Sequence, residues 1–165
     1  MHDLGGDKGG YFVVTTKVRG LPRRIYEHIR HDFVERIRRL TQWNRVVLVG
    51  EKIIGMNAEY RHHGEDLVYS IYGDLMALGC EDRTVDELGV TPPTMGQFLN
   101  DMAAMQGAAS VITLGTGGNT SMAMASGNCY SFVGFSEMEE FFSRMPWRPR
   151  GCRMFDNVEA FLGGI

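Results

Sequence analysis

The sequence predicts an α/β fold: a three-layer, Rossmann-like, doubly wound domain with a mainly parallel sheet of about five or six strands. Two observations lead to this prediction. Short apolar runs typical of buried strands alternate along the chain with segments of helical periodicity. A glycine-rich loop also follows one of these runs and leads into a further helix. Strands that alternate with helices form βαβ units, in which the strands are parallel.

The first half of the chain contains three predicted strands and one predicted helix. Residues 11–16 are a short β-rich run, and 45–50 is a continuous apolar run of the kind that is covered on both faces of a parallel sheet. Residues 67–72 are a third strand candidate. The stretch 25–40 is predicted as a helix because four apolar residues recur at helical spacing and share one face: Ile29, Phe33, Ile37 and Leu40.

The second half of the chain continues the alternation after residues 73–95, which predict no clear element. Gly127 ends the predicted helix 120–126, and Ser136 with Glu139 forms the capping box of the predicted helix 136–144. In chain order, the predicted elements are helix 97–109, strand 110–114, helix 120–126, strand 129–133, helix 136–144 and helix 156–162.

The composition fits one globular domain. The chain has 165 residues, 44% of them hydrophobic and 22% charged, with a formal net charge of -3. This charge gives no footprint for nucleic acid, and we expect no nucleic-acid partner. We predict a flexible lead-in or linker remnant over residues 1–10 and a single Rossmann-like nucleotide-binding domain over 11–165.

The sequence also predicts the environment of the protein. No apolar run reaches the roughly 18 residues that a membrane span needs, and residues 1–10 lack the apolar core of a signal peptide. Three cysteines without C-x-x-C spacing indicate reduced thiols. We therefore expect a cytoplasmic protein without a membrane span.

The strongest local signal is the segment that joins strand 110–114 to the next helix. Glycines let a backbone approach a ligand closely, and free amides at a helix start favour a phosphate or another anion. The alternative is a tight turn that needs glycine only for packing. The predicted binding residues are Gly115, Thr116, Gly117, Gly118, Asn119 and Thr120.

Charged residues follow two other predicted strands. Lys17 and Arg19 lie in the first predicted βα loop, where they could neutralise a diphosphate; the alternative is a solvated basic turn. Glu51 follows the second strand and could accept hydrogen bonds from a ribose; the alternative is a surface charge. Because ligands of parallel sheets bind beyond the carboxyl ends of the strands, we expect these residues to gather near the glycine loop.

Metal and nucleophile chemistry is not predicted. The adjacent His62 and His63 diverge and lack H-x-x-x-H or H-E-x-x-H spacing, so we expect no metal site. The sequence contains no G-x-S-x-G elbow, and Cys129, which begins a buried strand, is expected to be inert.

With these elements in place, the chain resembles the C-terminal, nucleotide-sugar-binding domain of a GT-B glycosyltransferase of the heptosyltransferase-like group. That group carries a D-[ST]-G-x-x-H-x-A-x-A-x-G segment after its fourth strand. The run 46–50 with Glu51 is similar to the group's second strand and its acidic ending. Thr116 and Ser121 depart from the group's acidic and histidine positions. The small residues that match the pattern are Gly118, Ala123, Ala125 and Gly127.

The resemblance implies a function and its partners. The donor would be a nucleotide-diphosphate sugar, a substrate rather than a cofactor, held by the 115–120 loop, Lys17 and Arg19, with Glu51 on the nucleoside. The acceptor and the catalytic base would come from a missing N-terminal domain, so no catalytic residue is assigned here. A sugar-nucleotide epimerase-like domain and a non-catalytic binding or interaction module are the alternatives. We also hold self-association into a homo-oligomer as a hypothesis.

Overall fold

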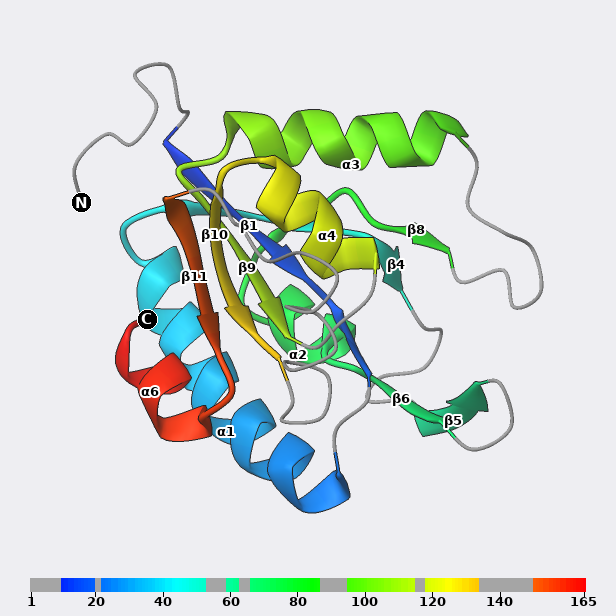
Figure 1. Cartoon of the computed structure of the whole chain (residues 1–165), viewed down its shortest axis with the longest axis vertical. Coiled ribbons are helices and arrows are strands. Elements are labelled where there is room, and N and C mark those ends of the chain that lie inside the picture. Colours follow the sequence, from blue (N-terminus) through cyan, green and yellow to red (C-terminus); the bar gives the residue numbers. More distant parts are fainter. Residues whose placement is uncertain are drawn as a thin grey trace.

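The computed structural model describes residues 10–19, 22–52, 59–62, 66–86, 95–114, 118–133 and 150–165. A sheet of six parallel strands lies between two layers of helices (Figure 1). This arrangement confirms the predicted fold class, a three-layer, doubly wound, Rossmann-like α/β domain. None of the helices within those ranges is long and apolar enough to cross a membrane.

The strand order of the sheet is β11-β10-β9-β1-β3-β7. If only these six strands are counted along the chain, the order is 3-2-1-4-5-6, which is that of dinucleotide-binding folds. The order reverses between β1 and β9. Their bounds are β1 (Tyr11–Thr15), β3 (Arg45–Val49), β7 (Glu81–Asp82), β9 (Ser110–Leu114), β10 (Asn128–Phe132) and β11 (Gly151–Phe155).

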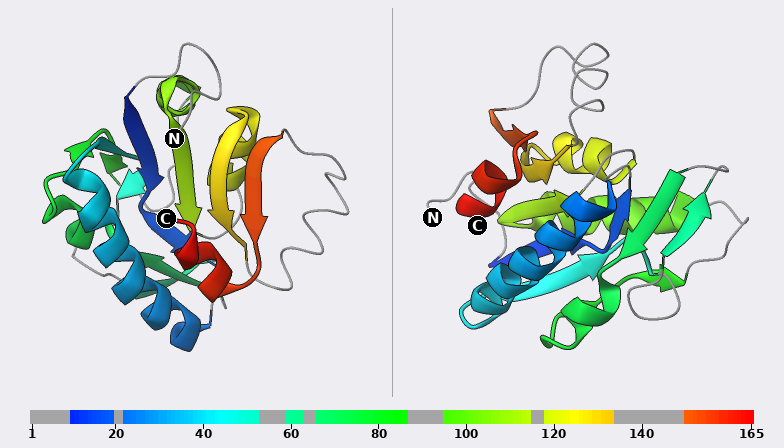
Figure 2. Two further views of the ribbon diagram at one scale, coloured as in Figure 1. Left: turned by 90° about the vertical axis from the view of Figure 1, so that its left-hand side faces the viewer. Right: turned by 90° about the horizontal axis from the view of Figure 1, so that it is seen from below.

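The two faces of the sheet are covered by different helices. Figure 2 shows α1 (Arg23–Thr41) and α6 (Val158–Gly163) in front of the strands, and α2 (Tyr72–Met76) packs against the same core. The opposite face is covered by α3 (Met95–Gly107) and α4 (Gly118–Ala125).

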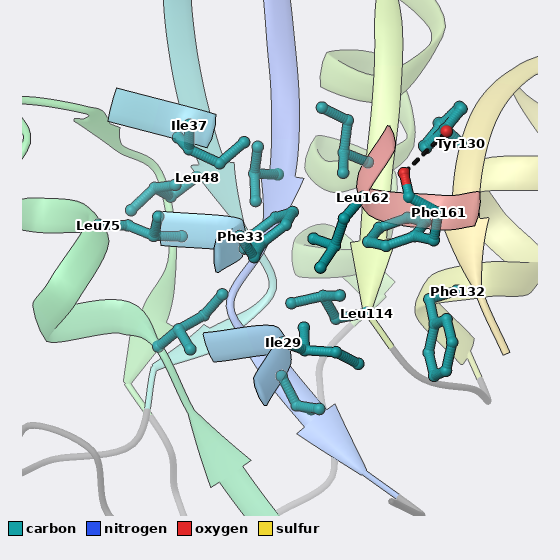
Figure 3. Close-up of a cluster of buried hydrophobic side chains, with 14 of the residues drawn as sticks. Ile29, Phe33, Ile37, Leu48, Leu75, Leu114, Tyr130, Phe132, Phe161 and Leu162 are labelled. Carbon is teal, nitrogen blue, oxygen red and sulfur yellow. Dashed lines mark hydrogen bonds between the residues drawn. The ribbon is translucent and has the colours of Figure 1, made fainter. Parts of the chain in front are cut away.

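The larger core cluster lies between the sheet and α1, α2 and α6 (Figure 3). In agreement with the predicted helix face, Ile29, Phe33 and Ile37 are fully buried, whereas Leu40 is half-buried at the rim of the cluster. Phe161 of α6 is inserted among the aromatic rings of this core, and its carbonyl accepts a hydrogen bond of 2.8 Å from the Tyr130 hydroxyl. Helix α6 therefore closes the core over β10 and β11.

A second core cluster lies under α3 and α4. It contains the inward residues of the opposite sheet face, among them Val13, Val47 and Val111, together with Met105 and Met124 from the two helices. At its rim the Tyr11 hydroxyl donates a hydrogen bond of 2.7 Å to the carbonyl of Ala104. Both faces of the central strands are thus apolar, which explains why β1, β3 and β9 read as continuous hydrophobic runs.

Short strands continue the chain beyond the main sheet. The strand candidate 67–72 does form a strand, but it lies outside the main sheet: β6 (Asp66–Ser70) pairs antiparallel with β2 (Lys17–Arg19) and β5 (Glu59–His62) in a separate three-stranded sheet. In addition, β4 (Glu51–Lys52) pairs with β8 (Val85–Asp86). An apolar run favours a strand but does not select the sheet that the strand joins.

Two strands of the main sheet, β7 and β11, were not predicted. β7 is a two-residue strand within the stretch that predicted no clear element, and β11 follows Pro146 and Pro149, which predict a break. The predicted helix over 136–144 lies outside the described residues. The remaining predicted helices and strands match the structure to within about two residues, the normal spread of helix and strand boundaries.

Candidate functional site

The candidate site lies at the carboxyl ends of β1 and β9, where the strand order reverses. Open parallel sheets bind their ligands in this position because the chain leaves the two strands toward opposite faces of the sheet. Strand β1 leads into β2 on one side, while β9 ends at Leu114 and α4 begins at Gly118 on the other. In the sequence, the glycine loop lies between β9 and α4.

Three buried hydroxyl groups gather beside the start of α4. The Thr113 hydroxyl donates a hydrogen bond of 2.6 Å to the Ser131 Oγ of the neighbouring strand β10. The Thr120 Oγ1 of α4 lies 3.5 Å from the Thr113 Oγ1. All three side chains are buried. They form a polar layer, the hydroxyl layer, between the carboxyl ends of the strands and the first turn of α4.

Thr15, the last residue of β1, adds a fourth hydroxyl on the same face. It lies two residues after Val13, and Thr113 lies two residues after Val111, the register partner of Val13. Because alternate side chains share a face, Thr15 and Thr113 point the same way. Thr15 is fully buried, and its Oγ1 has no hydrogen-bond partner within the described part of the chain. An unpaired buried hydroxyl is costly, and a ligand or water at this edge would satisfy it.

A carboxylate from α3 also reaches this edge. Asp101 is half-buried and accepts a hydrogen bond from the backbone N–H of Gly50, the residue that follows β3. Burial raises the pKa of Asp101 to about 6, and the Gly50 hydrogen bond opposes that rise. Gly50 has a φ of 91°, a conformation that favours glycine. Asp101 thus fixes the turn that leads from β3 into β4.

The structure places the basic candidates differently from the prediction. Lys17 and Arg19 do lie between β1 and α1, but they belong to strand β2 rather than to a loop. The reason is their pairing with β6, which extends the chain directly after β1. Lys17 is half-buried. Glu51 begins β4 directly after Gly50, so the backbone of all three residues lies just beyond the ends of β1 and β3.

The glycine-loop candidates divide into three groups. Gly115, Thr116 and Gly117 lie outside the described residues. Gly118 and Asn119 are the first two residues of α4, which starts two residues earlier than predicted. Thr120 is fully buried, and its hydroxyl lies against Thr113. Its side chain belongs to the hydroxyl layer, because α4 turns that residue toward the sheet, and its role as a ligand donor stays a prediction.

No protein-family model, curated protein or solved structure matches the chain. Sequence reasoning missed Thr15 and Asp101 as members of the site. A signal for Asp101 was present, since it is the one charged residue in the sequence of α3.

The described residues at this edge do not indicate metal binding or a cysteine nucleophile. Across the described ranges, no group of three or more His, Cys, Asp or Glu side chains is placed to hold a metal ion. Cys129 is buried in the second core cluster, and its pKa is raised by a hydrogen bond with Cys152 and by burial. This environment disfavours the thiolate form of Cys129 while the core is closed.

Two threonine-to-valine variants are expected to change stability in opposite directions. Thr15→Val removes an unpaired buried hydroxyl and should raise the free energy of unfolding by about 1 kcal/mol. Thr113→Val removes the donor to Ser131 and should lower it by about 1 to 2 kcal/mol. Urea denaturation of both variants measures the difference. Equal destabilisation by the two changes would mean that Thr15 has a partner within the protein itself.

Proposed function

We propose that this chain is a donor-binding domain of a glycosyltransferase that holds a nucleotide-diphosphate sugar at the carboxyl edge of its sheet. One observation supports the proposal most strongly: the reversal of strand order coincides with the start of α4 and with the unpartnered, buried hydroxyl of Thr15. The site thus combines the usual ligand position of the fold with a polar atom that has no hydrogen-bond partner among the described residues.

The start of α4 supplies the chemistry for an anion. The first backbone N–H groups of a helix have no partner within the helix, and the helix dipole favours negative charge there. The first turn of α4 contains no acidic residue that would repel a phosphate. A diphosphate placed here would lie next to the hydroxyl layer, and the Thr15 hydroxyl could donate to one of its oxygens.

The charged residues complete the proposed binding mode. Lys17 and Arg19 follow β1 within four residues, and we propose that they neutralise the diphosphate. Glu51 follows β3 and would accept from the ribose hydroxyls. In transfer, amides and basic groups would stabilise the departing nucleoside diphosphate electrostatically. The acceptor and the catalytic base would come from an N-terminal domain, and the enzyme would act in the cytoplasm.

Thermal-shift measurements with UDP, GDP, ADP, CMP and their sugars test the proposal. A ligand at about one hundred times its Kd stabilises the folded state by about 2.7 kcal/mol, so we expect one diphosphate to raise Tm by about 5 to 10 °C. Thr15→Val and Arg19→Ala should reduce that shift. Arg39→Ala, on the exposed far end of α1, is the matched control and should retain it.

The outcomes of this screen are distinct. A shift that Arg19→Ala and Arg39→Ala reduce equally would place binding elsewhere or make it a nonspecific charge effect. The absence of any shift with a folded sample would contradict donor binding and would favour a non-catalytic interaction module.

A further inference from the structure

Two of the three cysteines lie side by side on neighbouring strands, a feature that the proposed function does not use. Cys129 of β10 and Cys152 of β11 are register partners in the parallel sheet. Both are buried, both belong to the cluster under α3 and α4, and neither is in a disulfide. Cys80 is also buried but belongs to the opposite cluster.

The geometry of this pair fits a covalent link. Neighbouring strands lie about 4.8 Å apart, and disulfides join Cα atoms that are about 4.4 to 6.8 Å apart. Register partners in a parallel sheet point to the same face, and here the Cys129 thiol is hydrogen-bonded to Cys152. The Cys152 thiol also lies 3.7 Å from the carbonyl of Met124. The two side chains therefore lie side by side on one face of the sheet before any reaction.

We propose that Cys129 and Cys152 are an oxidation site, at which a small-molecule disulfide converts the two thiols into a cross-strand disulfide. One cysteine thiolate attacks the small disulfide, forms a mixed disulfide and releases one small thiolate. The other cysteine thiolate then attacks the protein sulfur of that mixed disulfide and releases the second small thiolate. The protein loses two protons and two electrons, and the small disulfide is reduced to two thiols.

The position of β11 provides access for the reaction. Among the described strands, β11 is the end strand of the sheet and is paired on one side, with β10. Edge strands open more readily than central ones because fewer hydrogen bonds hold them. Opening of β11 would expose Cys152 first. Side chains that point the same way from parallel strands must bend to reach disulfide geometry, so this strain offsets part of the stabilisation that the link provides.

The expected effect of the link is on stability rather than on the carboxyl-edge site. Cys129 is the second residue of β10 and Cys152 is the second residue of β11, so both lie at the amino ends of their strands. The link would close the chain from 129 to 152 into a loop and constrain the unfolded state. From the length of that loop we expect Tm to rise by about 5 to 10 °C on oxidation.

The experiment compares the full chain with Cys80→Ala, Cys129→Ala and Cys152→Ala after each is unfolded and refolded in oxidised or reduced glutathione. In the unfolded chain both thiols are accessible, so the reaction does not depend on the opening of β11. Thiols are then alkylated under denaturing conditions and counted by intact mass. From the three free cysteines, we expect one alkylated thiol in the oxidised wild type and none in Cys80→Ala. Cys129→Ala and Cys152→Ala should each retain two.

The Cys80→Ala variant keeps the test decisive even where a variant of the pair fails to fold. A mass about 2 Da lower before alkylation, with a raised Tm, supports the link. Retention of all thiols in oxidised glutathione, or a peptide map that joins Cys80 to either partner, would overturn the proposal.

Discussion

Replacement of Phe161 by alanine is expected to lower the free energy of unfolding by about 3 to 5 kcal/mol. The side chain is fully buried in α6, and its ring lies among four others. A cavity at this point removes contacts with two layers at once, because it lies between α1 and the sheet (Figure 3). The distances between ring centroids are 6.2 Å to Phe33, 5.2 Å to Tyr130, 5.7 Å to Phe132 and 6.1 Å to Phe155.

Urea denaturation, monitored by circular dichroism, measures the loss in the free energy of unfolding of Phe161→Ala. Phe98→Ala is the matched control, since Phe98 is 45% exposed on α3 and the same change there should cost less than about 1 kcal/mol. Comparable losses from both variants would contradict the assignment of Phe161 to the centre of the core. A small loss at both positions would mean that α6 does not close the core in solution.

Replacement of Gly151 by alanine should be the second most damaging change, with an expected loss of about 3 kcal/mol. A Cβ at this position would overlap the backbone carbonyl oxygen of Gly127, and backbone has little freedom to give way. Gly127 itself has a φ of 80° in the turn between α4 and β10. We expect the start of β11 to separate from β10, which hydrogen exchange of the β11 amides would show alongside the denaturation curve.

Gly163→Ala is the matched control for this prediction. An added Cβ at Gly163, the last residue of α6, meets no atom within 4 Å. Since alanine favours a helix over glycine by up to about 1 kcal/mol, this variant should be neutral or slightly stabilising. Destabilisation by Gly163→Ala as large as that of Gly151→Ala would point to a general intolerance of the C-terminal region.

The central strands and α1 could be predicted because their signal is local. β1, β3 and β9 are short apolar runs, and the inward face of α1 repeats at helical spacing. β7 could not be predicted, since its two residues, Glu81 and Asp82, are both acidic and are held by pairing with β3. β6 has the composition of a central strand, and only its antiparallel pairing with β2 and β5 assigns it elsewhere.

The position proposed for the site could be inferred from the sequence more readily than its members. The glycine loop and the charged residues after β1 and β3 follow from the rule that parallel sheets bind at their carboxyl edge. Thr15 and Asp101 were missed because their significance comes from burial and from a distant partner, neither of which has a local sequence signal. Thr120 carries a plausible donor in the sequence, but its direction depends on how α4 packs on β9.

The contact between α1 and α6 has a consequence for the timing of folding during synthesis. His28 and Glu159, which join these helices, are 131 residues apart in the chain. At the usual rate of ribosomal synthesis, on the order of ten seconds would pass between the synthesis of α1 and that of α6, which covers the apolar face of α1. During that interval the apolar face of α1 would be exposed to solvent, including Ile29, Phe33 and Ile37. A nascent chain of this protein is therefore a natural client for chaperones that bind apolar helices, and slower translation of its second half would lengthen that dependence.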